Sequence, residues 1–169
     1  KITACIRLAV PYTGMIISTR ESPATRERLL HYGISQISGG SKTSVGGYAE
    51  NTPGSEQFDV SDNRTLDEVI YWLMQCGHIP SFCTACYRAG RTGDRFMDFC
   101  KNKQICNFCL PNALMTLKEY LEDYASTETK LLGEKLIEQE LFHIKDTDRR
   151  NLCKNWLEKI HHGKRDFRF

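Results

Sequence analysis

A capped helix followed at once by a strand is the pattern that most restricts how this chain can fold, and it occurs twice in the first half of the sequence. In the first unit, Ser22 is placed to cap a helix that has Pro23 at its first position. Leu29 and Leu30 give this helix an inward face, and Gly33 ends it. The residues that follow, ISQIS, predict a strand.

The second unit repeats this plan. Thr65 and Glu68 form a capping box ahead of an apolar helix face, and Gly77 precedes the strand-like segment HIPSF. With an opening strand expected at residues 6–10, the chain would hold three strands separated by helices. Because parallel strands require such crossover connections, the pattern favours an α/β fold.

Between the two units lies the long Gly- and Ser-rich segment SGGSKTSVGGYAENTPGSEQ, which follows a strand at its C-terminal end. Loops at that end of a β/α barrel build the active site, so this segment is a candidate for substrate contacts. A flexible, solvated connection is the alternative.

The character of the sequence changes after Cys109, where helical periodicity replaces strands. Helices are expected at about residues 113–124, 128–144 and 148–162. The last of these would bury one face made of Leu152, Cys153, Trp156, Leu157 and Ile160. We therefore expect a helical C-terminal domain.

The composition is that of a globular protein: 169 residues, 40% hydrophobic and 26% charged. A net charge of +2 is too small to indicate nucleic-acid binding. No apolar run approaches the ~18 residues of a membrane span, and the first residues lack the layout of a signal peptide. We expect an intracellular protein with no nucleic-acid or membrane partner.

Eight cysteines in such a chain point to metal, because the cytosol disfavours disulfides. Cys83 and Cys86 form one C-x-x-C pair, and Cys106 and Cys109 form a second pair after 19 intervening residues. This spacing fits a structural zinc site with four thiolate ligands. That reading would make the segment a non-enzymatic module.

A second assignment uses Cys83, Cys86 and Cys109, and would leave one corner of a four-iron cluster free for a non-protein ligand. Cys5, Cys76 and Cys153 lie within strand or helix patterns, where a free cysteine is usually a small buried hydrophobe. The role of Cys100 stays open.

The loop between the pairs is basic. Arg88, Arg91 and Arg95 would bring positive charge beside an anionic thiolate-bound cluster, and would raise its potential and attract anionic ligands. A solvated basic loop is the alternative.

The segments CTACYRAGRTGDRFMDF and NFCLPNALMTLKEYLEDYAS together resemble the C-terminal cluster region of the HydG family, the FeFe-hydrogenase maturases among the radical-SAM tyrosine lyases. Upstream, RLAVPYTGMIISTRE, GISQISGGSKTSVGGY and EQFDVSDNRTLDEVI are similar to the last barrel units that this family shares with ThiH, the tyrosine lyase of thiamine synthesis. ThiH lacks the C-terminal cysteine set.

This resemblance implies an α/β fold in which residues 1–82 form the last units of a radical-SAM β/α (TIM-type) barrel. Residues 83–169 would form an auxiliary cluster loop and a helical, cluster-binding C-terminal domain. It further implies a radical-SAM carbon–carbon lyase that uses S-adenosylmethionine and a first 4Fe-4S cluster to split L-tyrosine into p-cresol, CO and cyanide. The products would be loaded on a labile iron, held with free cysteine at an auxiliary 4Fe-4S cluster, for H-cluster maturation with HydE and HydF.

By the same resemblance, Cys83, Cys86 and Cys109 hold the auxiliary cluster, and Arg20 clamps the carboxylate of the amino-acid substrate. A guanidinium suits that task because it can hold a carboxylate through two parallel hydrogen bonds. Ser18, Ser38 and Ser41 are further candidates for this pocket.

The C-x3-C-x2-C signature of the first cluster is absent from the sequence. We therefore expect a fragment that has no tyrosine lyase activity alone and no catalytic residue of its own. The expected location of the complete protein is the cytoplasm, or an organelle matrix in a eukaryote.

Overall fold

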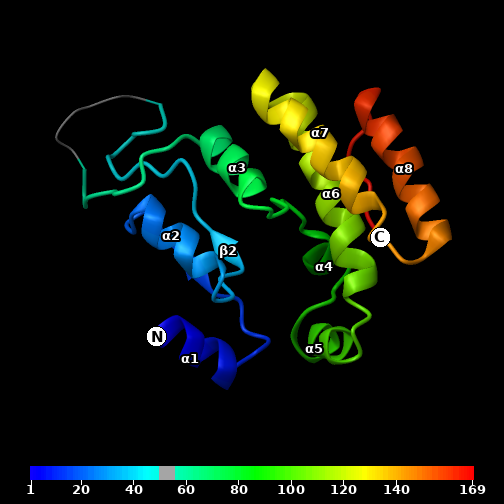
Figure 1. The fold of residues 1–169 in the computed structure, drawn as a ribbon, viewed down its shortest axis with the longest axis horizontal. Helices are drawn as coiled ribbons and strands as arrows, with labels where there is room; N and C mark the ends of the chain where they lie inside the picture. Colours follow the sequence, from blue (N-terminus) through cyan, green and yellow to red (C-terminus); the bar gives the residue numbers. More distant parts are fainter. Residues whose placement is uncertain (50–55) are drawn as a thin grey trace. The chain divides into compact units, whose positions relative to one another are not determined.

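The structure is a computed structural model that describes residues 1–49 and 56–169 (Figure 1). It divides into two compact units, Lys1–Val69 and Ile70–Phe169. The boundary between them falls inside a helix, whereas the sequence predicted a domain boundary between residues 82 and 83. That domain boundary stays a prediction.

The first unit contains a βαβ crossover. Strand β1 (Ile16–Ile17) pairs in parallel with β2 (Gln36–Ile37), and helix α2 (Pro23–Leu30) connects them. The predicted cap is present, because the Ser22 side chain accepts a hydrogen bond from the Thr25 amide. The first predicted unit is therefore confirmed.

The predicted opening strand at residues 6–10 is wrong, because helix α1 (Ile2–Ala9) occupies this segment. The aliphatic residues gave a strand-like local pattern, but Arg7 fixes the end of a helix by donating to the carbonyls of Pro11, Thr13 and Gly33. Cys5 lies in α1 and is exposed, so it is not the buried hydrophobe that we expected.

A buried ion pair lies in the first unit, and no local sequence pattern predicted it. Arg26 on α2 donates to the Asp62 carboxylate and to the Ser38 carbonyl at the end of β2. Both charged side chains are fully buried. Arg64 shares the Asp62 carboxylate at 2.6 Å, and hydrogen bonds from Arg64 lower the pKa of Asp62 despite its burial.

Helix α3 (Leu66–Gln75) has the predicted capping box, in which the Thr65 amide donates to the Glu68 carboxylate at 2.7 Å. The expected strand HIPSF does not form. This segment has no regular secondary structure, and its Phe82 amide donates to the Thr116 hydroxyl instead, at 3.2 Å. Within the described residues the sheet has two strands, not three.

The second unit is helical. Two short helices, α4 (Ala85–Arg88) and α5 (Gly93–Lys101), were not predicted. The three predicted helices are present as α6 (Cys106–Asp123), α7 (Thr127–Leu141) and α8 (Thr147–His161). Helix α6 begins earlier than expected and contains Pro111.

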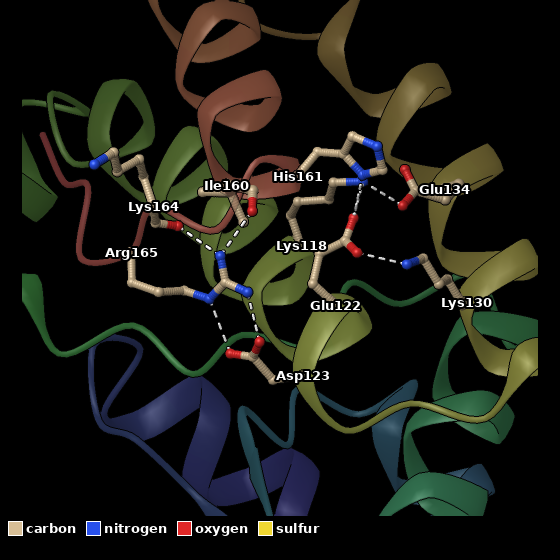
Figure 2. A network of polar contacts seen from close by, with 9 residues as sticks. All are labelled: Lys118, Glu122, Asp123, Lys130, Glu134, Ile160, His161, Lys164 and Arg165. Atoms are coloured by element: carbon tan, nitrogen blue, oxygen red, sulfur yellow. Dashed lines mark hydrogen bonds and ion pairs between the residues drawn. The ribbon is translucent and has the colours of Figure 1, made fainter.

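Helix α6 packs against both α7 and α8, and their shared core includes Leu114, Leu121 and Ile137. On the predicted buried face of α8, Cys153, Leu157 and Ile160 are buried, Trp156 is half-buried and Leu152 is exposed. A polar network around Glu122 also joins the three helices (Figure 2).

The predicted loop after β2 includes residues 50–55, which lie outside the described residues. Among the residues that are described, no helix has both the length and the apolar character needed to cross a bilayer.

Candidate metal centre

Three of the predicted metal ligands line one cavity in the second unit. The cavity has a volume of about 390 Å³ and is lined by Ser81, Cys83, Cys86, Tyr87, Arg91, Thr92, Gly93, Phe96 and Cys109. Cys106 and Cys100 are not among the lining residues. The structure therefore brings together the three-cysteine set and leaves out the residue that only the zinc assignment uses.

Local structure explains how each cysteine reaches the cavity. Cys83 lies in an irregular segment that is fixed where the Phe82 ring stacks on Tyr120, with ring centroids 5.2 Å apart. Cys86 lies on the short helix α4, which begins directly after this segment. Cys109 lies in the first turns of α6, so two helices and one irregular segment contribute cysteines to the cavity.

One backbone amide is already directed at a sulfur atom. The Ala85 amide donates to Cys83 Sγ at 3.4 Å. Hydrogen bonds to sulfur stabilise thiolate charge and help to set the potential of iron–sulfur clusters. This loop thus has the local chemistry of a thiolate site.

Two thiols at or near the cavity have a raised pKa. Burial, followed by the neighbouring thiols of Cys86 and Cys83, raises the pKa of Cys109 to about 11 although part of the residue remains exposed. Burial also raises the pKa of Cys100, with smaller contributions from Cys86 and Cys106. A bound cation would reverse this effect, because metal coordination deprotonates a thiol.

The spacing of the thiols bears on which metal could bind. Among residues 1–49 and 56–169, no three Cys, His, Asp or Glu side chains gather closely enough to hold a single metal ion. A zinc ion needs its four ligands at about 2.0–2.3 Å. In a 4Fe-4S cluster each cysteine binds a different iron, so the three sulfur atoms can stand farther apart. Which metal these cysteines hold stays a prediction.

Of the three arginines in the loop, Arg91 alone lines the cysteine cavity. It is buried, and its Nη2 donates to the Phe169 carbonyl at 2.8 Å. Arg88 instead pairs with the Asp166 carboxylate, and Arg95 is exposed. The loop sequence does not distinguish the three arginines, because the burial of Arg91 depends on residues distant in the chain.

The predicted substrate residues lie in the first unit. Ser18 directly follows β1 and Ser38 directly follows β2. Since β1 and β2 are parallel, Ser18 and Ser38 lie at the same end of the sheet, where both strands finish. Ser41 follows Ser38 by three positions. Arg20 is exposed, and its guanidinium lies 3.8 Å from the centroid of the Phe58 ring. Their role in substrate binding stays a prediction.

Comparisons with known proteins first show which class of protein part of this chain resembles. The family model of the Biotin and Thiamin Synthesis associated domain matches residues 1–79. Over 79 residues the chain is 44% identical to 2-iminoacetate synthase of Escherichia coli (strain K12) and 41% identical to that of Salmonella typhimurium (strain LT2). These matches cover 46% of this chain and 21% of each relative, so the chain spans about a fifth of their length.

The more particular likeness is to the crystal structure of HydG, a maturase of the [FeFe]-hydrogenase. The sequence identity is 52%, the TM-score is 0.93, and the match covers 99% of this chain and 36% of HydG. The resemblance that the cysteine segments indicated is therefore confirmed: the chain is similar over nearly its whole length to a C-terminal part of HydG. This likeness also confirms the predicted fold class, which is that of a radical-SAM protein.

Proposed function

We propose that the complete protein is a radical-SAM tyrosine lyase that converts L-tyrosine into p-cresol, CO and cyanide. It would load CO and cyanide on iron for FeFe-hydrogenase H-cluster maturation. The observation that carries this proposal is the cavity shared by Cys83, Cys86 and Cys109, in a chain that matches HydG along 99% of its length.

The extent of the likeness favours the HydG reaction over that of 2-iminoacetate synthase alone. The match to the 2-iminoacetate synthases extends over 79 residues, whereas the match to HydG takes in the cysteine segment as well. A lyase that stops at tyrosine cleavage has no need of a second cluster, and three thiols around one cavity would then have no role.

In this proposal the thiolates of Cys83, Cys86 and Cys109 hold an auxiliary 4Fe-4S cluster. When bound, the cluster supplies the place where the tyrosine fragment is converted and where a labile iron receives the products. The chain's own contribution is to hold three thiolates, to donate the Ala85 amide to Cys83, and to place the buried positive charge of Arg91 at the wall.

The other partners follow from the same family. Arg20, with Ser18, Ser38 and Ser41, would bind the carboxylate end of tyrosine. S-adenosylmethionine and its own 4Fe-4S cluster would bind outside this sequence, and free cysteine would help to hold the labile iron. HydE and HydF would be the maturation partners, in the cytoplasm or an organelle matrix.

The test uses the complete protein, reconstituted without oxygen and supplied with tyrosine, S-adenosylmethionine and reductant. We expect p-cresol and CO from the wild type. Cys109→Ala should still yield p-cresol but should lose CO, because tyrosine cleavage does not use the auxiliary cluster. An undiminished CO yield in Cys109→Ala would contradict the proposal.

A further inference from the structure

Residues 164–169, which follow α8, form a strap without regular secondary structure that runs back along α6 (Figure 1). Two backbone amides fix its course. The Asp166 amide donates to Glu119 Oε1 at 2.7 Å, and the Phe169 amide donates to Asn112 Oδ1 at 2.9 Å. Two aromatic rings of the strap also pack against the tryptophan of α8. The strap is therefore fixed to both α6 and α8.

The strap also contacts the loop that carries Cys86. The Asp166 carboxylate pairs with Arg88 of α4 through two contacts, one of them from Nη2 to Oδ2 at 2.8 Å. The Phe169 carbonyl accepts a hydrogen bond from Arg91 Nη2, also at 2.8 Å. Arg88 follows Cys86 by two positions, and the Arg91 amide donates to the Cys86 carbonyl at 2.8 Å. The strap thus holds both arginines that adjoin Cys86.

Helix α4 depends on such contacts for its position. It is a single turn of four residues, and the Thr84 side chain makes no capping hydrogen bond. Short helices are unstable in water without packing against the rest of the protein. Ala85 is buried at the start of α4, whereas Arg88 at its end is half-exposed and is held by Asp166. Cys86 lies between these two points, so its position depends on the strap.

The backbone of Asp166 has an uncommon conformation. Its φ of +70° lies in the left-handed region, which few residues other than Gly, Asn and Asp adopt. In this conformation the amide donates to Glu119 of α6 while the carboxylate reaches Arg88 of α4. Such a conformation persists where the surrounding contacts fix it. One residue therefore links the helix that carries Cys109 to the helix that carries Cys86.

We propose that the strap is a clamp for the metal centre, in which Arg88 and Asp166 are positioning residues that keep Cys86 directed at the cavity it shares with Cys109. A guanidinium and a carboxylate joined by two parallel contacts fix orientation as well as distance. An exposed ion pair contributes little to global stability, so its effect is on the local order of α4. The inference rests on the proposed function where it concerns a cluster, but the position of Cys86 can be measured without metal.

Asp166→Asn tests the clamp in the complete protein, because asparagine has the same size and tolerates the same backbone conformation. In the metal-free protein, iodoacetamide should alkylate Cys86 about two- to fivefold faster, the factor by which an exposed ion pair shifts a local opening equilibrium. Arg88→Gln should have the same effect, and the double variant should react no faster than either single variant. The two changes alter the local charge in opposite directions. Rate changes of opposite sign would therefore show a purely electrostatic effect and overturn the clamp.

Arg168→Gln is the matched control, because Arg168 contacts the same Asp166 carboxylate at 3.1 Å but lies on the strap itself. It should leave the Cys86 rate unchanged, and an equal rise in this control overturns the clamp. Cys153 is an internal control, since it is fully buried and its alkylation requires unfolding of α8 from the core. A Cys153 rate that rises in parallel with the Cys86 rate shows a general loss of stability and overturns the inference.

The same variants, reconstituted with iron and sulfide, give the second readout. In Asp166→Asn and Arg88→Gln, the electron paramagnetic resonance signal of the auxiliary cluster should shift in its g values, whereas Arg168→Gln should match the wild type. Faster alkylation of Cys86 in both variants, in a protein that binds no cluster, contradicts the proposed function and leaves the clamp standing. A cluster with identical g values in the wild type and both variants contradicts the clamp and leaves the proposed function standing.

Discussion

Lys118 and Glu122 lie one turn apart on α6 and form an ion pair with Nζ and Oε1 2.8 Å apart, although both side chains are only about a tenth exposed. Glu122 also accepts from Lys130 of α7 and from His161 of α8, as Figure 2 shows. Burial disfavours the ionised carboxylate, but the hydrogen bonds from Lys118, Lys130 and His161 outweigh burial and lower the pKa of Glu122 to about 2.

We predict that Glu122→Gln destabilises the complete protein strongly. The change leaves Lys118 buried with Glu134 as its remaining carboxylate partner, and breaking a buried pair typically costs about 3–5 kcal/mol. We expect a loss near the lower end, about 3 kcal/mol, since the pair keeps slight exposure. The free energy of unfolding in urea measures it. Glu138→Gln, at an exposed position on α7, should change this free energy by less than about 0.5 kcal/mol.

From the lowered pKa of Glu122 we predict that the stability of the protein falls at acidic pH. A carboxyl group whose pKa is lowered by folding stabilises the folded protein at pH values above its ordinary pKa, which is 4.5 for Glu122. This contribution is lost as the pH falls toward about 2. The shift corresponds to at most about 3 kcal/mol. The wild type should therefore lose more stability than Glu122→Gln between pH 5 and pH 2 in parallel urea titrations. Parallel pH profiles for the two proteins would show that Glu122 carries no such contribution.

A third prediction concerns Arg20, the proposed partner of the tyrosine carboxylate. Arg20→Ala in the complete protein should weaken tyrosine binding by about 1.5–3 kcal/mol, the range for a hydrogen bond to a charged group, and should slow p-cresol formation with it. Equilibrium binding of labelled tyrosine measures the change. Arg28→Ala removes an exposed arginine from the last turn of α2 and should leave binding unchanged. Unaltered tyrosine affinity in Arg20→Ala would remove Arg20 from the site.

Local signals in the sequence were enough to predict several elements. The Ser22 cap, the capping box at Thr65 and the turn at Gly33 each depend on residues within a few positions of one another. The amphipathic patterns of α6, α7 and α8 are equally local. These features are present in the structure, although α6 begins earlier than its pattern indicated.

The predictions failed where the structure depends on contacts between residues that are far apart in the sequence. The sequence of residues 78–82 is typical of a strand, but a strand needs a neighbouring strand to pair with. Here the Phe82 amide donates to Thr116 and the Phe82 ring stacks on Tyr120 instead. The burial of Arg91 likewise depends on Phe108 and Phe169, which lie far along the chain. In the cysteine set, spacing alone left Cys106 and Cys109 equivalent, and only the fold places Cys109 on the cavity wall and Cys106 away from it.

The most direct test of the central claim compares Cys109→Ala with Cys106→Ala in the complete protein after reconstitution with iron and sulfide. Cys109→Ala removes one of three cysteine ligands, so the electron paramagnetic resonance signal of the auxiliary cluster should disappear. Cys106→Ala should leave that signal nearly intact. A zinc site with four cysteine ligands has no open position and no paramagnetic signal, and it would lose metal equally in both variants. Equal loss of metal in the two variants would contradict the three-cysteine cluster.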